Sequence, residues 1–177
     1  HLPVTGNLIS IAVEPPGRVA EVRALVKHLF PAVKTHKGPT NCGFTSKEYH
    51  TWLRKNCGVG SGSKFISDAI LNRSREFLEG LISGYFAGDG CLWADSNGAI
   101  QVTAVTTSEQ LRNDLIFVLQ HLGVLATAWN APRMHINSNW NDAYGLRVIS
   151  PHLSKLKSWF FYSDRQEKFE KLLNNKK

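Results

Sequence analysis

Hydrophobic and polar positions follow two kinds of repeat along the chain. Alternation typical of strands occurs in the segments 7–13, 34–44, 100–106 and part of 124–149. Apolar side chains at every third or fourth position, which predict helices with one face against a core, occur in the segments 19–29 and 111–122. The expected N-caps of helices, where a hydroxyl accepts from a free backbone N–H, are Ser46, Thr107 and Ser150. The pattern therefore predicts an α+β protein.

The same order of elements occurs twice, and matching positions stand at constant offsets. Equivalent apolar positions of the two predicted helices are 93 residues apart in the pairs Val22 and Leu115, Val26 and Leu119, and Leu29 and Leu122. Ser46 and Ser150, like Lys64 and Lys168, are 104 residues apart, which indicates 11 additional residues in the second sheet. We interpret this as a duplication, with a first half in residues 1–76 and a second half in residues 77–177.

The composition points to a polyanionic partner. The chain has 21 Lys and Arg residues against 14 Asp and Glu, a net charge of +7, which favours nucleic acid. The hydrophobic fraction of 42% is that of a globular domain, and no apolar run reaches the ~18 residues of a membrane span. Three scattered cysteines argue against structural zinc. They fit an intracellular setting, in the cytoplasm or nucleoid, and no signal-peptide pattern opens the chain.

Residues 77–90 predict a helix with three glycines on one face. Gly80, Gly84 and Gly88 stand four positions apart and therefore share a face of the helix. Each glycine inside a helix costs about 1 kcal/mol relative to alanine, so three in register need a compensating role. Close approach of a second helix supplies that role, because any side chain would hold the two backbones apart. We expect this face to be a helix–helix interface.

Asp89 closes this predicted helix, between Gly88 and Gly90. If two such helices pack side by side, two carboxylates meet at one end. Those carboxylates and the backbone carbonyls just before them, here that of Gly88, are the hard oxygen ligands that Mg²⁺ or Mn²⁺ prefers. A divalent cation shared with a scissile phosphate suits hydrolysis by an activated water. Asp89 and Gly88 are therefore the candidate metal ligands.

The segment Ile82-Ser83-Gly84-Tyr85-Phe86-Ala87-Gly88-Asp89-Gly90 resembles the signature of the LAGLIDADG homing endonucleases. The strand and helix of residues 102–123 are similar to the same family. Lys64-Phe65-Ile66 resembles the Lys-x-Ile-Pro segment of intein-borne members, although Ser67 stands at the position of the proline. The resemblance covers nearly the whole chain and extends to intein- and intron-encoded members.

This resemblance implies a fold of two pseudo-symmetric αββαββα halves, whose antiparallel sheets form a saddle over duplex DNA. Monomeric members of the family have two signature helices, one at the start of each half. At an offset of 93 residues, the first signature would end before His1. We therefore expect the first helix of the first half to be missing from this chain. Preceding residues, a second polypeptide or a second copy of the chain would supply it.

The resemblance also implies roles for individual residues. Asp89, Lys64 and Lys168 would be catalytic, with the two lysines beside the metal centre, where they stabilise developing negative charge. The candidate DNA-binding residues on the predicted sheets are Lys34, His36, Lys37, Asn41, Gln101, Thr103, Arg133, Asn137, Asn139 and Arg147. Arg and Lys suit guanine edges, whereas Asn and Gln suit adenine. For each of them, a phosphate contact or a solvated position is the alternative.

Two other groups of residues are given structural interpretations. We expect packing in the core or on a sheet, rather than base stacking, for Trp52, Trp93, Trp140, Trp159, Phe160 and Phe161. The segment Asp164-Arg165-Gln166-Glu167-Lys168 lacks the carboxylate-x-Lys spacing of another nuclease class and is not assigned to a second active site.

Together these features predict a site-specific DNA endonuclease that hydrolyses phosphodiesters of a long duplex target with Mg²⁺ or another divalent cation. The alternative is a catalytically inactive nucleic-acid binder with the same fold, either an RNA maturase or a DNA-binding regulator. The number of carboxylates assembled at the helix pair separates the two. A third interpretation, an unrelated basic interaction module, leaves the long resemblance without a reason.

Overall fold

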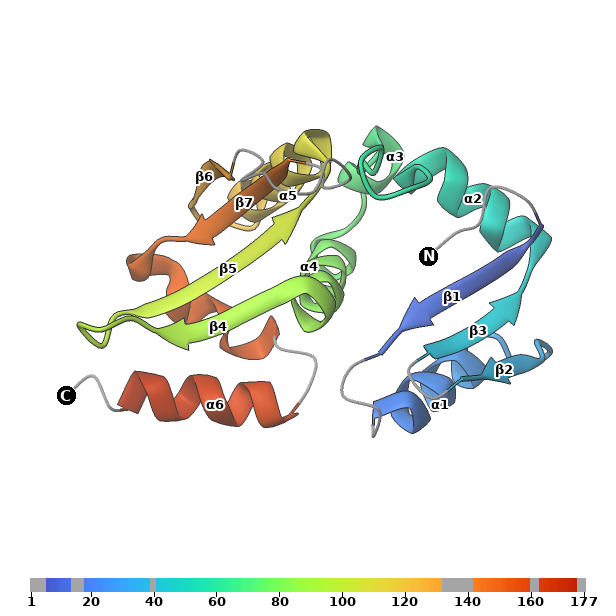
Figure 1. Cartoon of the computed structure of the whole chain (residues 1–177), viewed down its shortest axis with the longest axis horizontal. Helices are drawn as coiled ribbons and strands as arrows, with labels where there is room; N and C mark the ends of the chain where they lie inside the picture. Colours follow the sequence, from blue (N-terminus) through green and yellow to red (C-terminus); the bar gives the residue numbers. More distant parts are fainter. Residues whose placement is uncertain (1–5, 14–17, 39–40, 132–141, 160–162, 175–177) are drawn as a thin grey trace, which may run out of the picture. The chain divides into compact units, whose positions relative to one another are not determined.

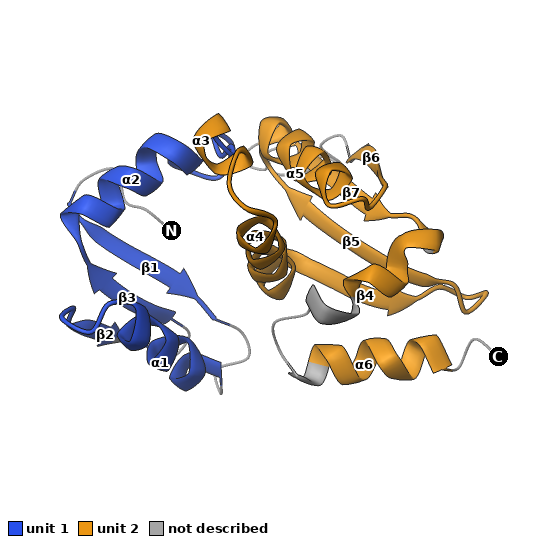
Figure 2. Cartoon of the chain, turned by 180° about the vertical axis from the view of Figure 1, so that it is seen from behind, with its two compact units in different colours: residues 1–67 blue, residues 68–177 orange. Residues whose placement is uncertain are grey.

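A computed structural model describes residues 6–13, 18–38, 41–131, 142–159 and 163–174 (Figure 1). The chain divides into two compact units, residues 1–67 and residues 68–177 (Figure 2). Residues 68–76, which the sequence repeat assigns to the first half, belong to the second compact unit. No helix in the described part of the chain is long and apolar enough to cross a membrane.

The described residues of the first unit form a three-stranded antiparallel sheet with the strand order β1-β3-β2 and two helices. Its elements are β1 (Leu8–Ala12), α1 (Val19–Leu29), β2 (Thr35–Lys37), β3 (Asn41–Thr45) and α2 (Lys47–Cys57). The apolar stripe of α1, which includes Val22 and Val26, is buried in a core with Ile9 and Phe44 from the sheet. Ser46 is the N-cap of α2, as predicted, since its hydroxyl accepts from the Tyr49 N–H at 3.2 Å.

The second unit contains a four-stranded antiparallel sheet with the strand order β4-β5-β7-β6. Its elements are α3 (Asp68–Leu71), α4 (Arg75–Asp89), β4 (Gly90–Ala94), β5 (Ile100–Thr106), α5 (Glu109–His121), β6 (Ala126–Ala131), β7 (Ala143–Val148), the 3-10 helix η2 (Ser150–Trp159) and α6 (Ser163–Asn174). The predicted α+β class is confirmed. The segment after Ser150, expected to be a regular helix capped by that residue, is instead a 3-10 helix that begins at Ser150.

One face of this second sheet carries the core. The buried side chains Val102, Ala104, Leu146 and Val148 alternate along β5 and β7, as a half-buried sheet requires. Helix α5 covers this face and lies behind the sheet in Figure 1 and in front of it in Figure 2. The N-cap of α5 is Ser108, whose hydroxyl accepts from the Leu111 N–H at 3.2 Å. The predicted cap, Thr107, is therefore wrong by one residue.

The two units share a common arrangement. If β4 is left aside, the second sheet has the order β5-β7-β6, which corresponds to β1-β3-β2 in the first. In chain order, α1 lies between β1 and β2, and α5 lies between the equivalent strands β5 and β6. The described residues of the first unit contain no counterpart of α4 or β4. The duplication predicted from the offsets is therefore visible in the topology.

Candidate nucleic-acid interface and catalytic carboxylate

Helix α4 has one buried face and one open face. Leu78, Ile82 and Phe86 are buried, and Ser74 caps the start of the helix through the Phe77 N–H. The predicted interface glycines, Gly80, Gly84 and Gly88, are all exposed on the other side. Outside their own helix, no described atom lies within 4 Å of the position that a Cβ would take at any of them. Within the described chain, this face is free to receive another backbone.

Asp89 is the last residue of α4, and its side chain is exposed. The backbone around Asp89, where α4 ends and β4 begins, is held by Arg165 of α6, which is far away in the sequence. The Arg165 Nη1 donates to the carbonyl oxygens of Phe86, at 2.5 Å, and of Gly90, at 2.8 Å. A cation at a helix C-terminus also complements the helix dipole. Arg165 therefore positions the backbone on both sides of the candidate catalytic carboxylate.

Arg165 is not among the predicted site residues, although Lys168 of the same helix is. Phe169, four residues further along α6, is fully buried and so marks the inward face of a charged helix. Residues four apart in a helix share a face, so this aromatic position was the available signal for Arg165. Lys168, the predicted catalytic lysine on the same helix, is exposed, and no hydrogen bond or ion pair to α4 is described for it.

Tyr85 lies one helical turn before Asp89. Burial, and then the negative charge of Asp89, raise the pKa of the Tyr85 phenol well above its ordinary value of 10.0, while Thr106 offsets this only in part. The hydroxyl oxygen is buried and forms no hydrogen bond of normal geometry with a described residue. The buried Tyr85 phenol therefore keeps its proton to a higher pH than an exposed tyrosine does.

The uncovered face of the second sheet carries the predicted residues Gln101, Thr103 and Arg147. They alternate with the buried positions of β5 and β7, so their side chains project from the face opposite the core. Thr103 pairs with Arg147, and the same cross-strand row continues to Cys91 on β4 and Thr127 on β6. One polar row with a central Arg therefore crosses all four strands.

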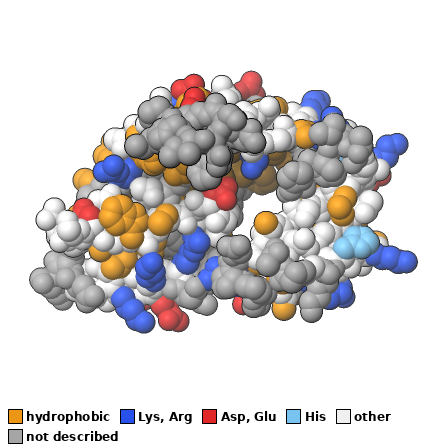
Figure 3. Space-filling view, viewed as in Figure 1, with side chains coloured by type: hydrophobic (Ala, Val, Ile, Leu, Met, Phe, Trp, Pro, Cys, Tyr) orange, Lys and Arg blue, Asp and Glu red, His pale blue; other side chains and the backbone are white. Residues whose placement is uncertain are grey.

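An apolar row runs beside this polar row. Val105 pairs with Gly145, and Gly145 pairs with Trp129. A Cβ on Gly145 would overlap the indole ring of Trp129, so the glycine lets that ring lie across β7. Trp93, expected to be a packing residue, is 45% exposed on the same face. Figure 3 shows hydrophobic side chains over β4 and β5, with basic side chains beside them.

The uncovered face of the first sheet carries two of its four predicted DNA-binding residues. His36 pairs with Gly43 and Asn41 pairs with Ala12, and both side chains are exposed on the face away from Ile9 and Phe44. Lys34 precedes β2 and is exposed. Lys37 pairs with Cys42, but its side chain lies outside the described part of the structure.

Other predicted residues are not brought together by the structure. Lys64 lies in the first unit, in the loop after α2, with an exposed side chain. Arg133, Asn137 and Asn139 lie outside the described residues, so their DNA-binding roles stay predictions. In the described part of the chain, no group of three or more His, Cys, Asp or Glu side chains could hold a metal ion.

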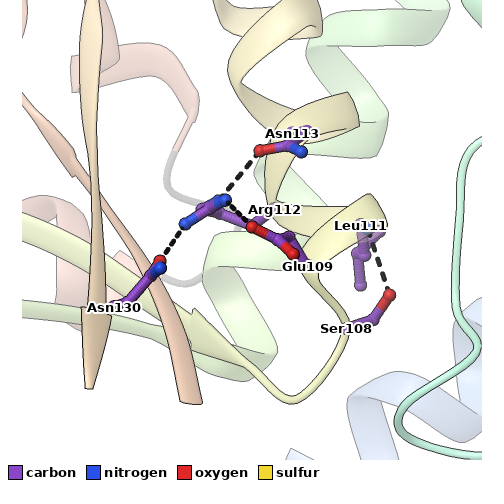
Figure 4. Close-up of polar contacts among 6 residues, drawn as sticks. All are labelled: Ser108, Glu109, Leu111, Arg112, Asn113 and Asn130. Carbon is purple, nitrogen blue, oxygen red and sulfur yellow. Dashed lines mark hydrogen bonds and ion pairs between the residues drawn. The ribbon is translucent and has the colours of Figure 1, made fainter. Parts of the chain in front are cut away.

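The second sheet is held from its covered side by a buried guanidinium that sequence reasoning missed. Arg112 of α5 is 6% exposed and donates to Asn113 and Glu109 on its own helix and to Asn130 on β6 (Figure 4). Its guanidinium carbon lies 5.4 Å from the ring centroid of Tyr144 on β7. Arg112 therefore ties α5 to the two strands whose opposite face carries Trp129 and Arg147.

Comparisons with known proteins agree with this geometry. The sequence profile of the LAGLIDADG-like domain matches residues 76–173, more than half of the chain. In solved structures, the chain is similar to I-DmoI in complex with DNA and Ca, with a TM-score of 0.53 and 16% identity over 88% of this chain and 74% of that one. A variant of I-DmoI bound to nicked target DNA in the presence of Mn gives a TM-score of 0.56 at 14% identity, over 88% of this chain and 80% of that one.

Curated relatives share a segment of about this size. An iron–sulfur cluster assembly SufBD family protein of Mycobacterium tuberculosis is 31% identical over 114 residues, 62% of this chain and 13% of that protein. An ATP-dependent DNA helicase of Thermococcus kodakarensis is 31% identical over 131 residues, 72% of this chain and 12% of the helicase. The matched segment thus spans about an eighth of each relative. By its matching profile and its fold, the chain belongs to the LAGLIDADG family and has the fold of the homing endonucleases.

Proposed function

We propose that the chain is a site-specific DNA endonuclease that hydrolyses phosphodiesters of a duplex target. One observation carries this proposal: α4 ends in the exposed Asp89, and the next residue begins β4, the edge strand of a sheet with an uncovered polar face. The candidate catalytic carboxylate of Asp89 is thereby one peptide bond away from the sheet whose uncovered face, here called the reading surface, would contact the bases.

The reading surface suits the major groove of DNA. That groove is about 12 Å wide and admits a two-stranded β-ribbon, and each base pair presents a distinct pattern of donors and acceptors there. The row of Thr103, Arg147 and Thr127 offers hydroxyl groups around a guanidinium, the group best suited to the two acceptors of guanine. Val105 and Trp129 offer apolar contact to thymine methyl groups. The net charge of +7 supports additional contacts to phosphates.

The residues at the end of α4 fit part of a divalent cation site. The Asp89 carboxylate is exposed, and the Gly88 carbonyl lies among the last four of the helix, which have no partner within it. Both are hard oxygen ligands of the kind that Mg²⁺ and Mn²⁺ take. A bound cation supplies Lewis acidity and a water of lowered pKa for attack on phosphorus. Arg165 keeps the two ligand-bearing residues in one backbone geometry.

A second carboxylate would come from a second helix on the glycine face of α4. The absence of any described neighbour at Gly80, Gly84 and Gly88 supports this role for the face. Residues that precede His1, a second polypeptide or a second copy of the chain would place another helix end beside Asp89. Lys64 and Lys168, by resemblance to the family, would stabilise charge at the scissile phosphate.

The relatives suggest how the module is carried. Proteins named as an iron–sulfur assembly protein, a helicase and a DNA polymerase each match this chain over 13%, 12% and 6% of their lengths, respectively. Unrelated proteins are expected to have one small segment in common when that segment is a mobile genetic element, which inserts into different host genes. We therefore propose an intein- or intron-borne homing function, exercised where the DNA is, in the cytoplasm or nucleoid.

The test is metal-dependent cleavage of a randomised library of duplex DNA. The wild-type chain, at concentrations that allow self-association, is expected to cut a subset of sequences with Mg²⁺ or Mn²⁺. Asp89→Asn should abolish cutting, because it removes a ligand charge with little change of shape, whereas Glu76→Gln, at the exposed start of α4, should not. Sequence-specific binding without cutting, equal in wild type and Asp89→Asn, would favour the inactive binder instead.

A further inference from the structure

The turn between β4 and β5 is organised around one carboxylate. The Asp95 N–H donates to the Ala99 carbonyl at 2.9 Å, and the Gly98 N–H donates to the Asp95 carbonyl at 2.9 Å. The Asp95 Oδ1 accepts from the backbone N–H groups of Asn97, at 3.0 Å, and Ala99, at 2.9 Å. An Asp side chain that bonds its own turn in this way is fixed in orientation.

The second oxygen of the same carboxylate contacts a residue on the uncovered face of the second sheet. The Asp95 Oδ2 accepts from Gln101 Nε2 at 3.0 Å. Gln101 is half-buried on the uncovered face and pairs across the strands with the exposed Trp93. An ionised carboxylate only accepts hydrogen bonds, so the amide nitrogen of Gln101, and not its oxygen, must face Asp95. The orientation of the Gln101 amide is therefore set by the turn.

We propose that Asp95 is a positioning residue that makes Gln101 read adenine, an inference that rests on the proposed function. With one Nε2 hydrogen engaged, Gln101 keeps one donor hydrogen and the acceptor Oε1, for which no partner is described. Adenine presents the complementary pair in the major groove, the acceptor N7 and the donor N6 amine. Guanine presents two acceptors there, N7 and O6, so its O6 would face the Gln101 oxygen.

If Asp95 only stabilises the turn between β4 and β5, a different result is expected. In that case, changes at Asp95 would alter stability or overall affinity but not the preferred base. Asp95→Asn separates the two roles, because the new side chain keeps Oδ1 for the turn and replaces Oδ2 by an amino group. That group cannot accept from Gln101, so the Gln101 amide turns over and presents two donor hydrogens to the groove. Two donors match the two acceptors of guanine.

The experiment selects bound sequences from a randomised duplex library in EDTA, which prevents cutting, and then measures affinities for single-base variants. Wild type should prefer adenine at one position, by roughly 5- to 100-fold, and Gln101→Ala should lose the preference there alone. Asp95→Asn should change the preference at that position to guanine. Ser96→Ala, in the same turn and exposed, is the matched control and should keep the wild-type sequence.

Asp95→Ser is a second variant, for the case that Asp95→Asn does not fold. Its hydroxyl can still accept from the turn but no longer reaches Gln101, so the adenine preference should weaken without becoming a guanine preference. A wild-type sequence preference that both Asp95 variants retain overturns the inference and leaves the proposed function standing. No sequence-dependent binding by the wild-type chain overturns both.

Discussion

Helices α1 and α5 occupy equivalent places in the two units but differ in what covers them. At the 93-residue offset, Leu25 and Leu29 of the first unit correspond to Val118 and Leu122 of the second. The first pair is 40% and 59% exposed, whereas the second pair is 0% and 2% exposed. In the second unit, α4 contacts α5, and Arg75 donates to the Leu122 carbonyl. No described residue of the first unit takes the place of α4. The signature helix therefore both presents Asp89 and completes the core of its own half.

Matched truncations of these leucines should give the largest difference. Leu122→Ala removes a buried side chain and should lower the free energy of unfolding by about 2–5 kcal/mol. Leu29→Ala, at the equivalent exposed position, should change it by less than about 0.5 kcal/mol. Urea unfolding monitored by circular dichroism measures both. Equal losses would show that the two helices are covered alike.

Removal of the buried guanidinium should have the next largest effect. Arg112→Met leaves Asn130 without its donor and uncouples α5 from β6, at a cost of about 1–3 kcal/mol. In the first unit, Arg23 of α1 donates one hydrogen bond to Thr35 of β2, at 3.0 Å. Arg23→Met should therefore cost less, about 0.5–1.5 kcal/mol. A larger loss for Arg23→Met in the same urea titration would reverse the comparison.

Arg165 gives a smaller effect with a functional component. Arg165→Met should lower stability by about 1–2 kcal/mol, because the carbonyls of Phe86, at the end of α4, and Gly90, at the start of β4, lose a charged donor. It should also slow cleavage, since the backbone around Asp89 is no longer held. Lys168→Met, on the same helix, should leave the unfolding free energy within about 0.5 kcal/mol of wild type. If the two variants unfold alike, Arg165 has no positioning role.

The smallest predicted effect is that of Tyr85 on the free energy of unfolding, and it is expected only at alkaline pH. The folded chain holds the Tyr85 proton more tightly than the unfolded chain does, because the pKa of Tyr85 is raised on folding. Tyr85 therefore makes stability fall as the pH rises through the ordinary value of 10.0, where only the unfolded chain ionises. Tyr85→Phe should reduce this fall and leave stability near pH 7 unchanged or higher. Urea titrations from pH 8 to about 11 test it, and identical pH profiles would contradict it.

The sequence was most informative where periodicity alone decides the outcome. Gln101, Thr103 and Arg147 could be placed on one face because they alternate with apolar residues, and α4 could be recognised from its glycines and Asp89. The contacts that position these residues could not be predicted. Arg165 reaches carbonyls 75 and 79 residues away in the chain, and the role of Arg112 depends on a strand 18 residues ahead.

Smaller errors have local causes. Thr107 and Ser108 are both hydroxyl residues, and the Thr106 hydroxyl accepts from the Ser108 N–H at 3.2 Å, which moves the start of α5 by one residue. The position of the Trp129 ring on the uncovered face could not be predicted, because it depends on the glycine opposite it, Gly145. A cross-strand partner of this kind is known only once the register of the strands is known.

In the proposed function, Asp89 at the end of α4 is needed to cleave DNA, whereas the uncovered face of the second sheet recognises the bases. The most direct test measures affinity and single-turnover cleavage on one selected duplex for Asp89→Asn and Arg147→Ala. We expect Asp89→Asn to bind within about twofold of wild type and not to cut. Arg147→Ala should bind roughly 5- to 100-fold more weakly, yet cut when the protein saturates the DNA. Cleavage by Asp89→Asn, or affinity lost equally in both variants, would contradict the account.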